Sequence, residues 1–291
     1  MISDLIYDVG MNNGDDTAYY LYRGYRVVAV EVDPALLGQA RDRFAPEIRR
    51  GQLELVSVAI GPRRETAQFW ICEGKSEWNS FDRQVASREG HACHALEVHC
   101  RPFRDLLGQY GVPVYLKVDI EGHDRYCVAD LDPSDLPTYV SVEMWGTTIE
   151  PLFKLRELGY SRFKLITQND HSELFIDPFS VDEFVKRRLR PYPRLYKLAA
   201  RGEHIRRLAS SSLNGQGTHR SPTNGSDWKF AFGSSGPFGE ETAGTWRTFD
   251  DVALTWLTYQ RGQSRYGPPS LDVWHDVHAR TESTRGHEPR A

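Results

Sequence analysis

Long hydrophobic runs and paired cysteines are both missing from this chain of 291 residues. Its longest apolar runs extend over only about four or five residues, whereas a helix that crosses a bilayer needs about 20. The first ten residues, MISDLIYDVG, lack the basic stretch and apolar core of a secretory signal. The four cysteines form no Cys-x-x-Cys pair, so we expect reduced thiols rather than a disulfide framework. Together these absences predict a cytoplasmic protein.

The net charge is also small, at −4 from 36 Lys plus Arg and 40 Asp plus Glu, which makes a nucleic-acid partner unexpected. The charge is unevenly spread, however. Residues 186–207 contain nine Lys or Arg and one acid, so they carry about +8 and leave −12 for the rest. This segment could be a lid over an anionic acceptor, a contact to an anionic membrane surface or to nucleic acid, or a solvated helix. The sequence leaves these alternatives and the oligomeric state open.

One cluster contains residue types that bind zinc, namely His91, Cys93, His94, His99 and Cys100. Its spacing fits no standard zinc module. The last residues of the cluster alternate like a strand, which would send His99 and Cys100 to opposite faces. We therefore interpret the cluster as a polar loop that enters a strand.

Short apolar segments alternate with helical patterns in the first half of the chain, which predicts a doubly wound, parallel α/β sheet. The expected strands are 5–10, 26–33, 53–61, 65–72, 95–100, 114–122, 138–145, 163–168 and 227–232. The expected helices are 15–25, 35–48 (ended by Pro46), 103–111, 148–160 and 248–262. An Asp N-cap is expected to begin the first helix.

The domain prediction is a single domain over residues 1–275 with one large insertion. The insertion, at about 179–227, combines the basic helical segment with a Ser/Gly/Asn-rich loop that we expect to be mobile. The polar tail, residues 276–291, is expected to be disordered.

The most informative stretch is residues 8–17, DVGMNNGDDT, directly after the first expected strand. Glycines there let a ligand approach the backbone, and the following helix N-terminus offers free N–H groups. Gly10 and Gly14 do not complete the G-x-G-x-x-G pattern of dinucleotide sites, which weakens an NAD interpretation. Glu31, at the end of the second strand, can accept hydrogen bonds from ribose hydroxyls. A glycine loop followed by a ribose acid is the general arrangement of S-adenosylmethionine (SAM) sites, and Ser57 and Val58 would then meet the adenine.

Four ionisable residues alternate at the end of the fourth parallel strand: Lys117, Asp119, Glu121 and His123. Such groups are costly to bury without partners, so a cluster at the carboxyl end of a parallel strand indicates a site. Glu143 occupies the corresponding end of the next strand. A structural alternative is an ion pair of Lys117 with Glu121 or Glu143.

Methylation of a hydroxyl requires a general base or a metal that lowers the pKa of the hydroxyl. The catalytic candidates are Asp119, His123 and Glu143, and His123 has the more suitable ordinary pKa. Paired carboxylates could instead hold Mg²⁺. The sequence does not decide between these roles.

Together the motifs resemble the FkbM family of SAM-dependent methyltransferases over residues 5–167. The matching segments are 8–17, 29–34 (AVEVDP), 57–61 (SVAIG), 78–80 (WNS) and, most specifically, 116–124 (LKVDIEGHD). Two positions depart from the family pattern: Met11 replaces the usual alanine, and Glu31 is not followed directly by proline. The resemblance implies a class I, Rossmann-like methyltransferase fold: a seven-stranded, mostly parallel sheet with helices on both faces and an antiparallel final strand.

The resemblance also implies methyl transfer from SAM, usually to a hydroxyl of a sugar, polyketide or related natural product. The residues it assigns to the cofactor are Asp8, Gly10, Asn12, Gly14, Thr17, Glu31, Ser57, Val58, Ala59 and Ser80, with Asp119 near the methyl donor. The acceptor is not implied. Two alternatives stay open, an RNA or protein methyltransferase that uses the basic segment and a nucleotide-binding protein without catalysis.

Overall fold

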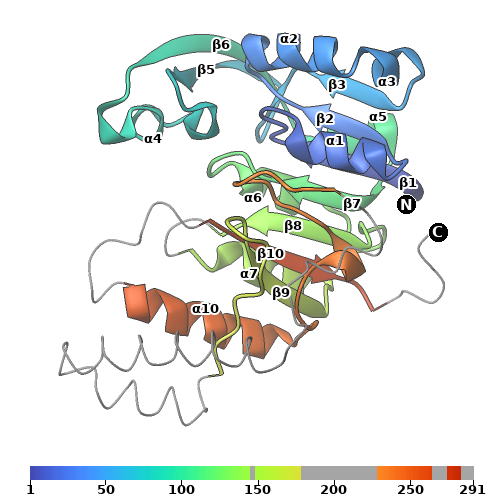
Figure 1. The fold of residues 1–291 in the computed structure, drawn as a ribbon, viewed down its shortest axis with the longest axis vertical. Helices are drawn as coiled ribbons and strands as arrows, with labels where there is room; N and C mark the ends of the chain where they lie inside the picture. The colour runs from blue at the N-terminus through green and yellow to red at the C-terminus, as the bar shows by residue number, and fades with distance from the viewer. Residues whose placement is uncertain (145–147, 178–227, 264–273, 283–291) are drawn as a thin grey trace.

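A seven-stranded sheet forms the centre of the computed structural model, which describes residues 1–144, 148–177, 228–263 and 274–282 (Figure 1). The strand order is β3-β2-β1-β7-β8-β10-β9. All neighbours are parallel except β10, which runs antiparallel to β8 and to β9. The strands are β1 (Ile2–Val9), β2 (Arg26–Val30), β3 (Leu53–Val56), β7 (Pro113–Val118), β8 (Tyr139–Glu143), β9 (Arg162–Thr167) and β10 (His275–Arg280). The predicted sheet of a class I methyltransferase is thus confirmed.

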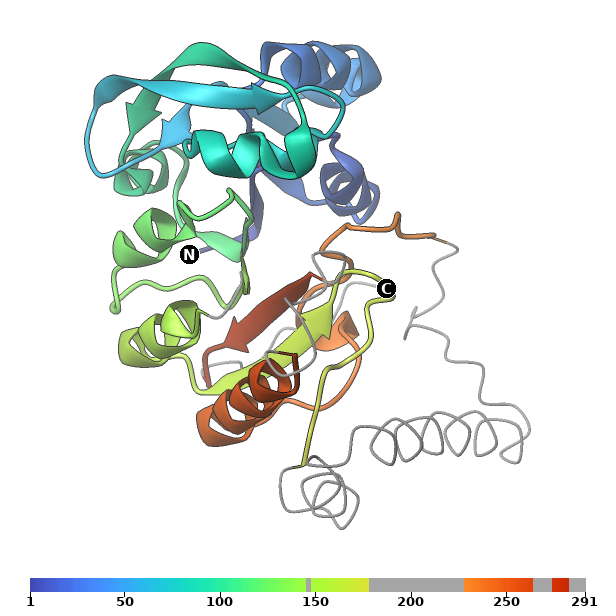
Figure 2. The ribbon, with the colours of Figure 1, turned by 90° about the vertical axis from the view of Figure 1, so that its left-hand side faces the viewer.

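Helices cover both faces of this sheet (Figure 2). The helices are α1 (Asp15–Tyr22), α2 (Pro34–Arg43), α3 (Ala45–Arg49), α5 (Phe103–Tyr110), α6 (Asp124–Ala129), α7 (Glu150–Leu158) and α10 (Phe249–Gln263). Successive residues of β1 illustrate the two cores, because side chains alternate across a strand. Tyr7 belongs to the core cluster that includes residues of α5, α6, α7 and α10, whereas Ile6 belongs to the cluster that includes residues of α1 and α2. Both side chains are fully buried.

The strand that completes the sheet lies in the segment that we expected to be disordered. Residues 276–280 belong to β10, which inserts between β8 and β9. Val277 and Ala279 face the α7–α10 core, while Asp276 and His278 are buried on the opposite face. Because half of this central strand is polar, its sequence does not show the apolar run typical of a buried strand. No strand forms over residues 228–232, where a strand was expected.

A second, three-stranded sheet forms a lobe beside the first. It consists of β4 (Ala59–Ile60), β6 (Cys93–Arg101) and β5 (Glu65–Cys72), with the short helix α4 (Arg83–Ala86) between β5 and β6. The expected third strand, 53–61, is therefore divided between two sheets. The helix expected to end at Pro46 ends at Arg43, and Pro46 lies in the first turn of α3, where its missing N–H costs nothing.

The whole of the predicted insertion at 179–227 lies outside the described residues, as do residues 283–291 of the tail. No helix in the described part of the chain is long and apolar enough to cross a bilayer.

Candidate active site

A cavity of about 280 Å³ opens at the carboxyl ends of β1, β2, β7 and β8, and the three-stranded lobe contributes one wall. Eight of the predicted site residues line it: Gly10, Asn12, Glu31, Val58, Ala59, Asp119, His123 and Glu143. Five do not line it: Asp8, Gly14, Thr17, Ser57 and Ser80. The cavity therefore joins the two ends of the predicted site, the glycine loop and the acidic strand ends. The five residues that do not line the cavity lie behind its wall or away from it.

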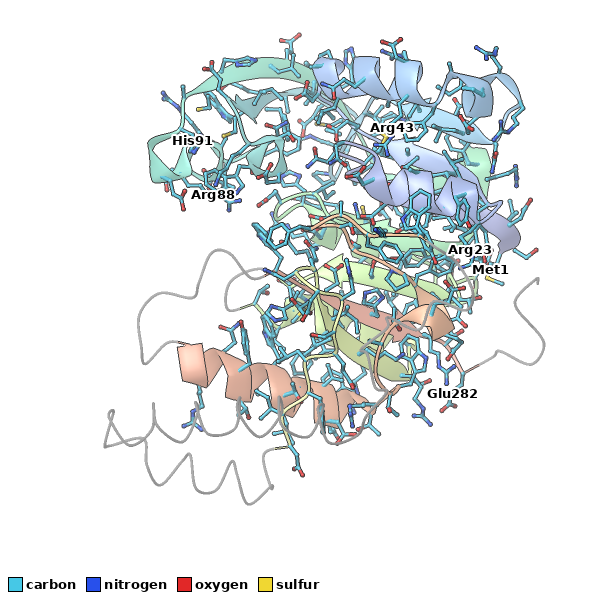
Figure 3. All side chains as sticks on the ribbon, viewed as in Figure 1. Met1, Arg23, Arg43, Arg88, His91 and Glu282 are labelled. Atoms are coloured by element: carbon cyan, nitrogen blue, oxygen red, sulfur yellow. The ribbon has the colours of Figure 1, made fainter. Side chains whose placement is uncertain are left out.

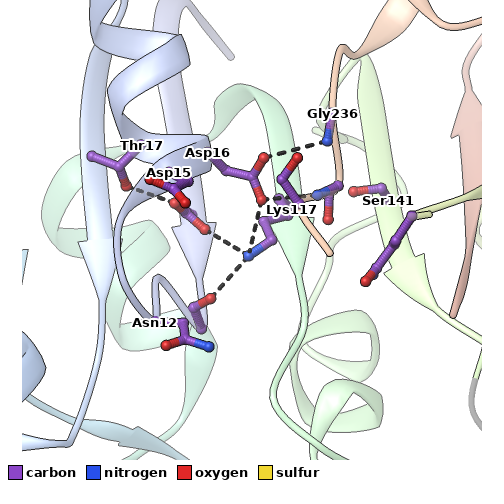
Figure 4. Close-up of polar contacts among 12 residues, drawn as sticks. Asn12, Asp15, Asp16, Thr17, Lys117, Ser141 and Gly236 are labelled. Atoms are coloured by element: carbon purple, nitrogen blue, oxygen red, sulfur yellow. Dashed lines mark hydrogen bonds and ion pairs between the residues drawn. The ribbon is translucent and has the colours of Figure 1, made fainter. Parts of the chain in front are cut away.

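Asp8 holds the glycine loop through Thr17 and Lys117, which are labelled in Figure 4. Its buried carboxylate accepts a hydrogen bond from Thr17 Oγ1 at 2.6 Å and one from Lys117 Nζ at 3.0 Å. Lys117 also donates to the Gly10 carbonyl at 2.9 Å, and its Nζ lies 3.8 Å from Asp16. The ion pair considered for Lys117 was therefore wrong in its partner, because Asp8 on the neighbouring strand is nearer than Glu121 or Glu143.

The neighbouring carboxylates favour the protonated, positively charged form of Lys117. Burial alone would lower the pKa of Lys117, but the carboxylates of Asp8 and Asp16 raise it above its ordinary value. Burial raises the pKa of Asp16 to about 6, and Lys117 opposes this rise. Asp16 also accepts hydrogen bonds from the backbone N–H groups of Ser235 and Gly236, which fixes the segment before α10 against α1.

The two glycines of the loop serve different purposes. Gly10 has φ +84°, and a Cβ there would lie 1.8 Å from the Asp119 carbonyl oxygen, so only glycine lets the loop approach β7 so closely. Gly14 has φ +79° and is the N-cap of α1, without a side-chain cap. A Cβ on Gly14 would lie 2.8 Å from the ring of Phe44. Gly14 is thus a packing residue, and the expected Asp N-cap was wrong.

Glu31 stands at the end of β2 with its carboxylate at the cavity wall. Its Oε2 accepts from Asn12 N at 3.0 Å, and its Oε1 accepts from the N–H groups of Val32 and Asp33 at 2.7 and 2.9 Å. Burial raises the pKa of Glu31, and these three donors oppose the rise. A carboxylate offers about four acceptor positions, so about one remains for a ligand hydroxyl. Glu31 therefore fits the ribose role while it also holds the glycine loop.

An apolar slot lies beside Glu31. Val58, Ala59, Ile60 and Phe69 line this part of the cavity, which suits a flat, uncharged ring such as adenine. Ser57 is exposed away from the cavity.

Ser80 stands behind the wall of the small lobe. It is buried, pairs with Trp70 through two backbone hydrogen bonds, and caps the turn before α4 through Asp82 N. Its neighbour Asn79, which the motif WNS contains but we did not single out, lines the cavity instead.

At the other end, three carboxyl groups lie on neighbouring strand ends. Asp119 directly follows β7, whose Val118 pairs with Val142, and Glu143 ends β8. Across β8 and β10, Asp276 is directly opposite Glu143. Asp276 was not predicted as a site residue, because its segment reads as a polar tail.

The carboxyl groups of this row resist ionisation. Burial raises the pKa of Glu143 well above its ordinary value, and the nearby carboxylates, Asp119 foremost, raise it further. Burial also raises the pKa of Asp119, which Lys117 opposes, and it raises the pKa of Asp276 to about 7. The carboxyl groups at this end of the cavity therefore hold their protons more tightly than exposed carboxyl groups do.

His123 is held in one tautomer. Its Nδ1 lies 3.2 Å from the Ile60 carbonyl oxygen, and its ring stacks on Phe81 with centroids 4.1 Å apart. A carbonyl oxygen only accepts, so Nδ1 carries the hydrogen and Nε2 keeps its lone pair in the neutral ring. Burial lowers the pKa of His123. The ring is thus neutral near pH 7 and can accept a proton at Nε2.

Arg88 connects the small lobe to the turn after β7. It lies on the side of the lobe that faces the large sheet (Figure 3) and pairs with Glu121 at 3.3 Å. Burial raises the pKa of Glu121 to about 8, and Arg88 opposes the rise. Gly122, in the same turn, has φ +89°.

Within the described ranges, no three His, Cys, Asp or Glu side chains are arranged to hold a metal ion. His99 is exposed and Cys100 is buried, as expected for opposite faces of a strand. The Mg²⁺ alternative receives no support from these residues.

Comparisons with known proteins agree with the motifs. A family model described as a methyltransferase FkbM domain matches residues 8–161. A crystal structure of methyltransferase FkbM from Methylobacillus flagellatus KT is 17% identical, with a TM-score of 0.33 over 49% of this chain and 34% of that one. A precorrin-6y C5,15-methyltransferase from Geobacter metallireducens GS-15 is 16% identical, with a TM-score of 0.31 over 57% of this chain and 69% of that one.

The chain thus spans about a third of the length of the Methylobacillus protein. No curated protein matches it. The family model covers more than half of the chain, and it includes both the glycine loop and the acidic strand ends. The chain belongs to the FkbM methyltransferase family.

Proposed function

We propose that this protein transfers a methyl group from SAM to a hydroxyl group of a small molecule, such as a sugar or polyketide. One observation carries the proposal. A single cavity joins a carboxylate suited to ribose, Glu31, with a neutral imidazole suited to accept a hydroxyl proton, His123. Methyl transfer to a hydroxyl needs both functions in one site.

The residues at the glycine-loop end of the cavity fit SAM. Glu31 would accept from the ribose, the slot of Val58 and Ala59 would border the adenine, and the loop at Gly10 and Asn12 would lie against the backbone of the ligand. Bound SAM supplies an electrophilic methyl group on a sulfonium sulfur. The strand order β2-β1-β7-β8 supports the proposal that the methyl group would react near Asp119 and Glu143.

His123 is the residue that we propose as general base. Its Nε2 is unprotonated at neutral pH, whereas the raised pKa of Glu143 makes that carboxyl a poor proton acceptor until it ionises. Asp119, between Lys117 and Glu143, would orient the acceptor hydroxyl.

The acceptor would enter past two aromatic side chains that also line the cavity. Phe232 is 69% exposed, and its ring lies 6.0 Å from that of Trp274. Such rings suit the apolar face of a sugar. The carboxyl row disfavours an anionic group next to the reacting hydroxyl. Recognition of an anionic group of the acceptor by residues 186–207 stays a proposal, as does contact of those residues with a membrane surface.

The test is methyl transfer from labelled SAM to panels of glycans and polyketides. Asp119→Asn should lower kcat by about 10²-fold or more while the Kd for SAM stays within a few-fold. Asp42→Asn, an exposed position on α2, is the matched control and should leave both values unchanged. If neither SAM nor its demethylated product binds at micromolar concentration, the proposal is wrong.

A further inference from the structure

The row of carboxyl groups at the strand ends has more acid than its one nearby lysine can neutralise. The charged groups around Glu143 are Asp119, Glu121, Asp124 and Asp276, with Lys117 below Asp119. Lys117 already pairs with Asp8 and lies near Asp16, and Arg88 pairs with Glu121. An added cation would therefore be the favourable charge at this end of the cavity.

Glu143 has an oxygen ready for such a cation. The residue is only 5% exposed, it lines the cavity, and its Oε2 has no hydrogen-bond partner among the described residues. A buried acceptor without a partner is costly, so native structures keep one only for a reason. Its neighbour Asp276 likewise has one unpartnered oxygen, Oδ2, beside the hydrogen bond that it accepts from Gln168.

The position of Glu143 indicates which cation this is. With the ribose at Glu31 on β2 and the adenine slot toward β3, the opposite part of SAM extends across β1 toward β7 and β8. That part contains the sulfonium sulfur, which is positive in SAM and neutral in the product S-adenosylhomocysteine (SAH).

We propose that Glu143 is the residue by which the protein distinguishes SAM from SAH, releasing its proton to solvent when the sulfonium enters and keeping that proton with the neutral thioether. This inference rests on the proposed function. The sulfonium of SAM replaces the proton of Glu143, so the net charge of the buried site is unchanged when SAM binds. After methyl transfer the sulfur is neutral, and Glu143 takes a proton back from solvent. The product then lacks the attraction between the sulfonium and the carboxylate, so it binds less tightly.

The consequence is a pH dependence that differs between the two ligands. Burial raises the pKa of Glu143 in the free protein, and a sulfonium beside it lowers that pKa. In the interval between these two pKa values, the affinity for SAM should rise by up to about tenfold per pH unit, since one proton is released. The affinity for SAH should lack this slope.

Isothermal titration calorimetry of the full chain with SAM and with SAH, between pH 6 and 8 in two buffers of different ionisation enthalpy, tests the inference. The wild type should release up to about one proton per SAM and none attributable to Glu143 per SAH. Glu143→Gln should remove the release and flatten the slope for SAM, while its unchanged SAH affinity shows that the variant is folded. Glu97→Gln, exposed on β6, makes the same side-chain replacement away from the cavity and should behave as the wild type. The amine of the ligand titrates identically in all variants, so their difference isolates Glu143.

Equal pH slopes for SAM and SAH in the wild type would overturn the inference while the proposed function stands. So would a slope for SAM that persists in Glu143→Gln. Absence of binding by both ligands is a different result, because it overturns the proposed function and the inference with it.

Discussion

Replacement of Lys117 by methionine should expose how strongly the glycine loop depends on one buried cation. Lys117 is 4% exposed, and its Nζ lies 3.0 Å from Asp8 and 3.8 Å from Asp16. Lys117→Met keeps most of the side-chain volume but leaves two buried carboxyl groups without their cation. Breaking a buried ion pair in this way costs about 3–5 kcal/mol. Chemical denaturation at pH 7.5 should show that loss of unfolding free energy.

The pH dependence gives the sign of the effect. The pKa of Asp16 is raised to about 6 from its ordinary 3.8, and loss of Lys117 would raise it further. A carboxyl group with a raised pKa in the folded state binds a proton more tightly there than in the unfolded chain. Lower pH therefore stabilises the folded state relative to the unfolded state. The deficit of Lys117→Met relative to wild type should therefore shrink as the pH falls from about 8 to about 5.

The matched control is Lys154→Met, which removes an exposed lysine 2.8 Å from Glu157. Exposed pairs contribute less than about 1 kcal/mol, so this variant should stay close to wild type at every pH. A Lys117→Met deficit no larger than the control's, or one that does not change with pH, would refute the reasoning.

Three further variants test other parts of the site. Gly10→Ala should lose at least about 2 kcal/mol more in denaturation than Gly24→Ala, because both have positive φ but only Gly10 would meet the Asp119 carbonyl oxygen; equal losses would contradict the close approach. His123→Asn should lower kcat by about 10²–10⁴-fold with SAM affinity kept. In the wild type, kcat/KM should fall on the acid side with an apparent pKa below 6.5, since burial lowers that of His123; an acid limb above 6.5 would assign the base elsewhere. Trp274→Ala should raise KM for the acceptor several-fold with Kd for SAM unchanged, and an unchanged KM would remove Trp274 from the acceptor site.

The local pattern of the chain was enough to locate the two halves of the site. The glycine loop and Glu31 each follow a strand with clear apolar character. The alternating residues from Lys117 to His123 lie at the end of another such strand. Parallel strands bring their carboxyl ends to one edge, so the convergence of Glu31, Asp119 and Glu143 on one cavity follows from the strand pattern.

The individual roles within that set did not follow from the pattern. Asp8 and Thr17 match the family motif, yet they hold the loop from behind the cavity. Ser80 likewise serves the small lobe, whose separation from the main sheet the alternation of strands did not reveal. Whether a polar side chain faces a ligand or a neighbouring strand depends on packing that spacing does not encode.

The sequence by itself determined the parallel strands of the main sheet, the glycine loop and the acidic strand ends at Asp119 and Glu143, because these depend on periodicity and on residues close together in the chain. Only the tertiary structure decided that Lys117 pairs with Asp8, 109 positions away, and that His275–Arg280 completes the sheet. Such choices depend on long-range pairing: a polar strand becomes central only where partners such as Gln168 compensate its buried groups. That same pairing sets Asp276 opposite Glu143, which adds a third buried carboxyl group beside this end of the cavity.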